Sequence, residues 1–169
     1  MPRDGDEHWA TPSPNSVKVN VDAAMFVDTH NFGFGMVARD CCGVLIQGKT
    51  VCCQGHVDPP ITEAMGVREA LSWIKTFPWQ LVTLETDSLV VVQALRSSMD
   101  MISLFGLVIK DCKNLLATMC NVSIFFVKRS TNSVAHAFAR ASSSYSDCVF
   151  SLGDVPTVLL PVLVVEVQV

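Results

Sequence analysis

The sequence lacks the features by which several protein classes are recognised. It contains no run of basic residues, no two cysteines at C-x-x-C spacing, and no unbroken apolar segment of the ~20 residues that cross a bilayer. Any binding to nucleic acid is therefore expected to be weak and salt-sensitive. A zinc site is disfavoured, because adjacent cysteines in a strand point to opposite faces. No membrane span is expected, since Pro161 and Glu166 interrupt the apolar segment 155–169.

The composition that is present favours one intracellular domain. Seven cysteines, an odd number, and the absence of a signal peptide indicate free thiols in a reducing compartment, the nucleus or cytoplasm. All but one of the 12 Lys and Arg residues lie within residues 17–146, so the net charge of −4 comes from acidic flanks. We expect a monomer with an extended lead-in (1–16), one domain (17–143) and an apolar tail (144–169).

The segment 17–24, VKVNVDAA, has the clearest local pattern. Val17, Val19 and Val21 alternate with polar residues, and this period of two indicates a strand with one apolar face. The polar face ends in Asp22, with two alanines beside it. A carboxylate fixed on a strand is suited to hold a metal ion or a reacting water.

The remaining patterns predict a mixed sheet. Strands at 32–39 and 44–53 follow tight turns and form an antiparallel meander with the first strand. Apolar residues at helical spacing then predict helices alternating with two more strands. The predicted ranges are a helix at 61–77, a strand at 81–85, helices at 89–96 and 102–119, a strand at 122–127 and a helix at 132–141. The fold class is therefore α/β, with the order β-β-β-α-β-α-α-β-α, a five-stranded sheet and helices on its faces.

Three carboxylates are candidates for one site. The right-handed crossover rule places the fourth strand beside the first and parallel to it, which brings Asp87, just after that strand, close to Asp22. Glu63 lies in the predicted first turn of the first helix. Each acid alone is more often structural, as a dipole partner or a loop cap. Together they form a set of oxygen ligands suited to magnesium.

Five segments match one family in order and spacing: VNVDAA (19–24), GFGMVARDCCG (33–43), TEAMGVREAL (62–71), ETDS (85–88) and VKRSTNSVAHAFAR (127–140). They resemble the plant branch of the type-1 ribonuclease H-like domains, which is often found at the end of retrotransposon-type reverse transcriptases. The lead-in, with Trp9, Pro12 and Pro14, is also similar to that branch.

The resemblance implies a magnesium-dependent nuclease, with manganese as an alternative ion, that cleaves the RNA strand of an RNA–DNA hybrid. Asp22, Glu63 and Asp87 match three of the family's four acids. The fourth position falls on His136, where the family's archetype has Asp. The loop 128–131 lacks the family's catalytic His, and the segment between Arg96 and Ile102 lacks the basic protrusion that some members use to grip the hybrid.

These departures keep other functions open. A nucleic-acid-binding module of the same fold whose nuclease activity has decayed would fit the same motifs. A protein-interaction domain that touches no nucleic acid is a third possibility. His136, taken alone on an apolar helix, is more often a packed residue than a ligand. His136 and the absent protrusion both favour weak activity over efficient cleavage.

Overall fold

Three long antiparallel strands form the first part of the sheet. In the computed structural model, which describes residues 4–165, β1 (Ser16–Phe26) pairs with β2 (Asn31–Arg39), and β2 with β3 (Leu45–Gln54). The strand β4 (Leu81–Thr86) lies parallel to β1, and β5 (Val122–Phe126) lies parallel to β4. The parallel pairing of β1 with β4 confirms the expectation from the crossover rule.

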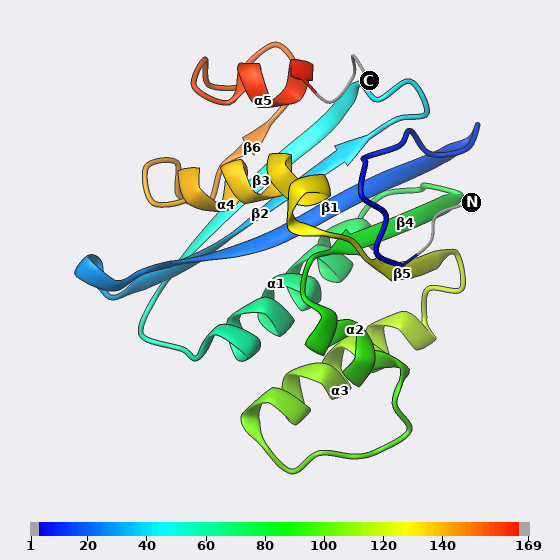
Figure 1. Cartoon of the computed structure of the whole chain (residues 1–169), viewed down its shortest axis with the longest axis vertical. Helices are drawn as coiled ribbons and strands as arrows, with labels where there is room; N and C mark the ends of the chain where they lie inside the picture. The colour runs from blue at the N-terminus through cyan, green and yellow to red at the C-terminus, as the bar shows by residue number, and fades with distance from the viewer. Residues whose placement is uncertain (1–3, 166–169) are drawn as a thin grey trace.

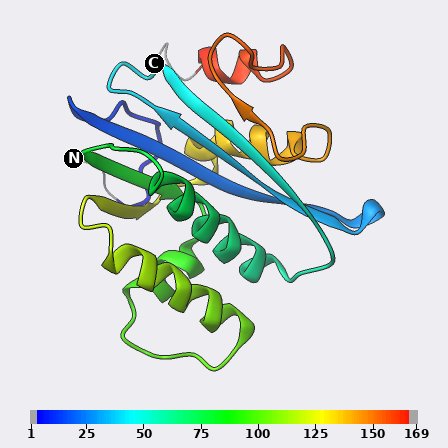
Figure 2. The same cartoon turned by 180° about the vertical axis from the view of Figure 1, so that it is seen from behind.

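Helices cover both faces of this sheet (Figures 1 and 2). One face carries α1 (Pro59–Ile74), α2 (Leu89–Arg96) and α3 (Leu104–Ala117). The other carries α4 (Ser133–Ala141), which follows the short 3-10 helix η2 (Arg129–Asn132), and α5 (Leu160–Val165). A second 3-10 turn, η1 (Val27–Thr29), lies between β1 and β2. The predicted α/β class and element order are confirmed.

Two elements were not expected. The two-residue strand β6 (Val149–Phe150) pairs with β3, which makes the sheet six-stranded in the order β5-β4-β1-β2-β3-β6. Downstream of it, Val155, Leu159 and Leu163 are buried against Leu45 and Phe138. Up to residue 164, the apolar tail therefore packs on the body as a second core. The larger core lies on the other face, between β1, β2 and α1.

The start of α1 differs from the prediction. The helix begins at Pro59 rather than at residue 61, with Asp58 at the N-cap position, and it ends at Ile74 rather than at Phe77. Proline is tolerated in the first helical turn because its missing N–H has no helical partner there. The Pro59-Pro60 pair therefore opens the helix instead of preceding it. As a result Glu63 falls in the second turn of α1, and not in the first.

The helix α4 lies unusually close to the sheet. A Cβ atom built on Gly35 would lie 2.1 Å from the backbone N of Ala139, and one on Gly48 would lie 2.4 Å from the Phe138 ring. Both glycines therefore leave the space that α4 occupies. Gly35 is also the register partner of Asp22 across the β1–β2 ladder, so this close approach brings α4 to the face that carries Asp22.

Two further findings concern the cysteines and membrane spans. All seven cysteines carry free thiols, as the sequence indicated. None of the helices within residues 4–165 combines the length and the apolar character needed to cross a bilayer.

Candidate metal centre

Asp22 is held rigidly in the middle of the sheet. Asp22 is only 3% exposed, and the backbone N–H of Ala23 donates to its Oδ1 at 2.8 Å. The alternation of β1 explains this position, since the valines of the strand enter the larger core and the polar residues face the other side. Burial and the nearby Asp87 carboxylate raise the pKa of Asp22 to about 6, partly offset by its bonds to His136 and Ala23.

Glu63 and Asp87 approach Asp22 from two other elements. Glu63 projects from α1. Asp87 follows Thr86, the last residue of β4, and Thr86 is in register with Val21 of β1. Ligand oxygens of the three carboxylates all lie within 4.8 Å of one another. Burial, then the charges of Asp22 and Asp87, raise the pKa of Glu63 to about 8, against a smaller lowering by Arg129. The structure therefore brings together the three acids singled out in the sequence.

This arrangement fits a hard divalent cation. Carboxylate oxygens are the ligands that magnesium and manganese accept, and three of them converge on one small volume. Burial first, and then the neighbouring carboxylates, raise the pKa values of Asp22 and Glu63, and a cation would offset both effects. Within residues 4–165 this is the one cluster of potential metal ligands, and it includes no cysteine.

His136 lies beside the cluster as a neighbour of Asp22. It projects from α4, and its Nδ1 lies 2.7 Å from Asp22 Oδ2, while its side chain is 39% exposed. The residue predicted as the fourth member is thus in contact with the first member. An imidazole at this position adds one nitrogen ligand or one hydrogen bond, but it does not add the negative charge that an Asp would supply.

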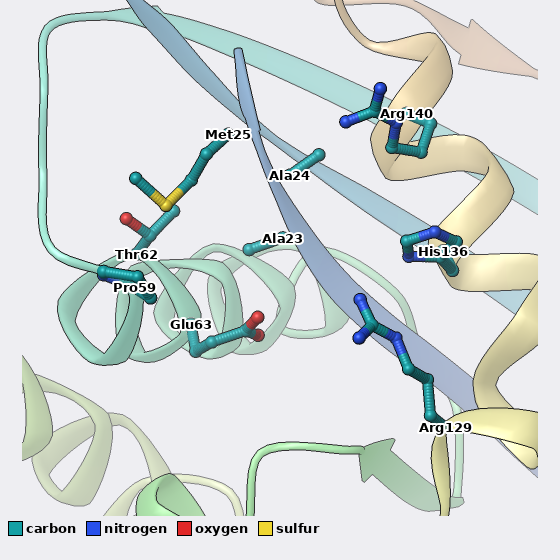
Figure 3. A pocket seen from close by; sticks show the side chains of 9 residues that line it. All are labelled: Ala23, Ala24, Met25, Pro59, Thr62, Glu63, Arg129, His136 and Arg140. Atoms are coloured by element: carbon teal, nitrogen blue, oxygen red, sulfur yellow. The ribbon is translucent and has the colours of Figure 1, made fainter. Parts of the chain in front are cut away.

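A cavity of about 210 Å³ opens next to these residues (Figure 3). Glu63 and His136 point toward it from opposite sides, and the guanidinium groups of Arg129 and Arg140 also line it. Arg140 lies in addition over the Phe26 ring, 5.3 Å from its centroid. The cavity therefore combines one carboxylate, that of Glu63, with two cationic groups, and it lies beside the cluster of three acids. A metal ion at the cluster and an anionic group in the cavity could bind side by side.

Sequence reasoning did not single out Asn132, Arg129 or Arg140 as site residues. Asn132 donates to Asp87 Oδ1 at 3.1 Å, and it sits one helical turn before His136. Arg140 sits one turn after His136, on the same side of α4. The spacing of four residues between Asn132, His136 and Arg140 was the signal in the sequence that could have identified Asn132 and Arg140, because residues four apart on a helix share a face. Glu69, six residues after Glu63 on α1, lies outside the cluster and pairs with Lys49.

Comparison with known proteins gives matches over most of the chain. A family model described as "Reverse transcriptase-like" matches residues 20–142. A candidate ribonuclease H protein of Arabidopsis thaliana is 30% identical over 157 residues, which make up 92% of this chain and 25% of that relative. The chain thus spans about a quarter of the length of that relative.

Solved structures show the same fold at low sequence identity. A ribonuclease H1 from Halobacterium salinarum has a TM-score of 0.68 at 21% identity, covering 78% of this chain and 99% of the other. A ribonuclease H1 from compost (LC11), in complex with an RNA/DNA hybrid, has a TM-score of 0.64 at 13% identity, covering 77% and 99%. The protease–reverse transcriptase of foamy virus, in complex with an RNA/DNA hybrid, has a TM-score of 0.59 at 15% identity, covering 86% and 22%.

Proposed function

Because this chain belongs to the reverse transcriptase-like family and forms a plant-type ribonuclease H-like domain, we propose that it is a nuclease that cleaves the RNA strand of RNA–DNA hybrids. The observation that carries the proposal is the convergence of Asp22, Glu63 and Asp87 within 4.8 Å. Similar folds have been solved with such hybrids bound, both as a separate ribonuclease H1 and within a reverse transcriptase.

The proposed cofactor is a pair of magnesium ions, which manganese can replace. Such a pair, when bound, activates the attacking water and stabilises the leaving oxygen in phosphodiester hydrolysis. Asp22, Glu63 and Asp87 would hold the ions, with His136 as a fourth, weaker member. Because Asp22 is buried and fixed by Ala23, its carboxylate needs little reorganisation to act as a ligand.

The remaining lining of the cavity suits the substrate. The guanidinium groups of Arg129 and Arg140 can contact phosphodiester oxygens beside the carboxylates. The body carries no further strongly basic strip, so binding is expected to be weak and to fall with salt. We also propose that the domain acts as a monomer inside the cell, in the nucleus or cytoplasm, in a context derived from a retrotransposon-type reverse transcriptase.

A second candidate is a nucleic-acid-binding or protein-interaction module of this fold that no longer cleaves. The observation that favours it is the contact of His136, whose Nδ1 lies 2.7 Å from Asp22 Oδ2. This side chain brings no negative charge to the site. Two dications placed in this site would be balanced by one carboxylate fewer than in the family's archetype.

Cleavage of a labelled RNA–DNA hybrid tests the proposal. The wild type is expected to cleave slowly in magnesium and faster in manganese, because manganese accepts imidazole more readily. Asp22→Asn should lower the rate by more than ~100-fold, since it removes a direct ligand. Asp28→Asn is the matched control, because Asp28 is an exposed acid at the tip of the β1–β2 hairpin.

The variant His136→Asp separates the two candidate functions. It restores a negative charge and an oxygen ligand, so the magnesium-dependent rate should rise by about 10-fold or more. An unchanged, measurable rate would make His136 a packing residue. If neither the wild type nor this variant cleaves in either metal, the enzyme proposal is wrong and the decayed module replaces it.

A further inference from the structure

A buried amide lies directly behind the three carboxylates. Asn132 is 1% exposed, and its Nδ2 donates both to Asp87 Oδ1 at 3.1 Å and to the backbone oxygen of Val21 at 2.9 Å. Val21 immediately precedes Asp22. One side chain at the start of α4 therefore ties the loop that carries Asp87 to the strand that carries Asp22.

Asn132 is itself fixed by a second amide. Its Oδ1 accepts from Asn20 Nδ2 at 3.2 Å, and that same nitrogen also donates to Glu85 Oε2 at 2.9 Å. Glu85 is neutralised by Lys18, whose Nζ lies 2.8 Å from Glu85 Oε1, and both side chains are buried. Buried ion pairs hold their geometry because any departure leaves an unsatisfied charge in a medium of low polarity.

The lead-in covers this buried polar group. Trp9 donates through Nε1 to Asn20 Oδ1 at 3.2 Å, and Arg39 Nη2 donates to the same oxygen at 2.9 Å. The Trp9 ring also lies 3.8 Å from the Arg39 guanidinium and 5.2 Å from Lys18 Nζ. The stacked indole excludes water from the charges beneath it, which strengthens their interactions.

The same lead-in is anchored beside Asn132. Gly5 N donates to Phe126 O at 2.9 Å, and Asp6 forms an isolated parallel bridge with Val127. Thr131, the residue before Asn132, donates through Oγ1 to the Asp6 backbone oxygen at 2.9 Å. The lead-in thus runs beside the end of β5 (Figure 1) and contacts η2, the turn that contains Asn132.

We propose that Asn132 is a positioning residue that holds Asp87 against Asp22 and Glu63, and that Trp9 of the lead-in keeps Asn132 in place through Asn20. This inference rests on the proposed metal site. Without a cation, three carboxylates within 4.8 Å repel one another, and Asp87 is the one that lies outside a helix or strand. The N–H of Asn132 opposes a movement of Asp87 away from the other two. Because the amide is neutral, it does so without the positive charge that would compete with a metal ion.

Manganese binding measured by calorimetry tests the inference. Asn132→Ala is expected to weaken binding by about 10- to 100-fold, the range found for groups that orient metal ligands. Asn121→Ala is the matched control, because Asn121 Nδ2 makes one bond, to Trp79 O at 2.7 Å, at the far end of β5. The control should bind manganese as the wild type does. Equal affinity of Asn132→Ala and the wild type would overturn the inference.

Trp9→Phe is a second, milder test, because Asn132→Ala could lose manganese affinity through loss of folding alone. It keeps the aromatic ring over Arg39 and removes only the bond from Nε1 to Asn20. We expect a smaller loss of manganese affinity, about 2- to 5-fold, with an unchanged circular dichroism spectrum. An affinity equal to that of the wild type would remove Trp9 from the proposal.

Kinetics distinguishes positioning from general damage. If the variants lose rate because Asp87 is misplaced, the hybrid KM stays constant, kcat falls, and a high manganese concentration restores it. A loss that no manganese concentration recovers would count against positioning. If the wild type binds manganese but cleaves no hybrid, the proposed nuclease function fails, whereas the binding comparison between variants still decides the role of Asn132.

Discussion

At the scale of single residues, the site consists of carboxylates whose ionised forms are destabilised by their surroundings in the folded chain. Asp22 and Glu63 are buried beside other carboxylates, and burial is the largest cause of their raised pKa values. The fold therefore contains an electrostatic strain at neutral pH. A cation removes that strain, so metal binding and stability are linked through these two residues.

This linkage gives a pH dependence of stability with a definite sign. The pKa values of Asp22 and Glu63 rise on folding, to about 6 and about 8, so the folded chain keeps protons that the unfolded chain releases. Their contribution is fully present below about pH 4 and is lost as the pH rises toward 8. In metal-free buffer the free energy of unfolding should fall by on the order of 5 kcal/mol from about pH 5 to pH 8, most of it from Glu63.

Urea unfolding at several pH values measures this change. Manganese should restore stability at the high end, where the carboxylates are ionised. Asp22→Asn should make the profile shallower without abolishing it, because the burial of Glu63 remains. Asp28→Asn should leave it unchanged. A pH-independent free energy of unfolding in the wild type would contradict the burial of charge at this site.

At the scale of elements, the site depends on how closely α4 approaches the sheet. The absence of a side chain at Gly35 lets the Phe138–Ala139 segment lie against β2. That contact places His136 within hydrogen-bond distance of Asp22, the register partner of Gly35. The position of α4 therefore depends on the absence of a side chain at Gly35 on β2.

Gly35→Ala should therefore damage both stability and the site. The added methyl would overlap the backbone at Ala139, so α4 must move outward at a cost of about 3 kcal/mol or more. The contact between His136 and Asp22 would lengthen with it. Gly153→Ala is the control, because a Cβ there meets nothing within 4 Å. Chemical unfolding of both variants measures the difference, and equal stabilities would mean that α4 is not held by this contact.

At the scale of the whole molecule, the sheet carries one core on each face. The larger core joins α1 and α3 to the sheet, and the smaller one joins α4 to the tail through Phe138, Leu159 and Leu163. The tail thus covers the helix that carries His136. The domain limits at residues 17 and 143 stay predictions. The packing of the tail bears directly on whether a chain that ends at residue 143 is as stable as the whole chain.

Substitution in the tail measures its contribution. Leu159 is 3% exposed, and Leu159→Ala should lower the free energy of unfolding by about 2–4 kcal/mol through the cavity that it leaves. The neighbouring Val158 is 66% exposed, so Val158→Ala should change it by less than about 0.5 kcal/mol. Thermal unfolding of the two variants provides the comparison. Similar melting temperatures would show that the tail does not stabilise the body.

Much of the fold could be predicted because it follows from repeating local patterns. The alternation around Asp22 and the handedness of crossovers suffice to place β4 beside β1. The strand β6 was missed because two residues show no alternation, and α5 because Pro161 stands in its first turn. The bonds of Asn132 were missed for another reason. Its partner Asn20 is a polar residue on a strand, which by itself indicates a solvent face. Only the tertiary structure shows that the lead-in covers Asn20.

The strand order also determines when the carboxylates meet. The neighbours β1, β2 and β3 are joined by short loops, whereas β4 reaches the other side of β1 only after β3 and α1. Closing that long loop costs more chain entropy, so the meander can assemble before the parallel pair forms. We therefore expect Asp22 to be in its strand before Glu63 and Asp87 arrive, with their repulsion opposing only the closing step. Refolding with and without a divalent cation should consequently differ in its slow phase and agree in its fast one.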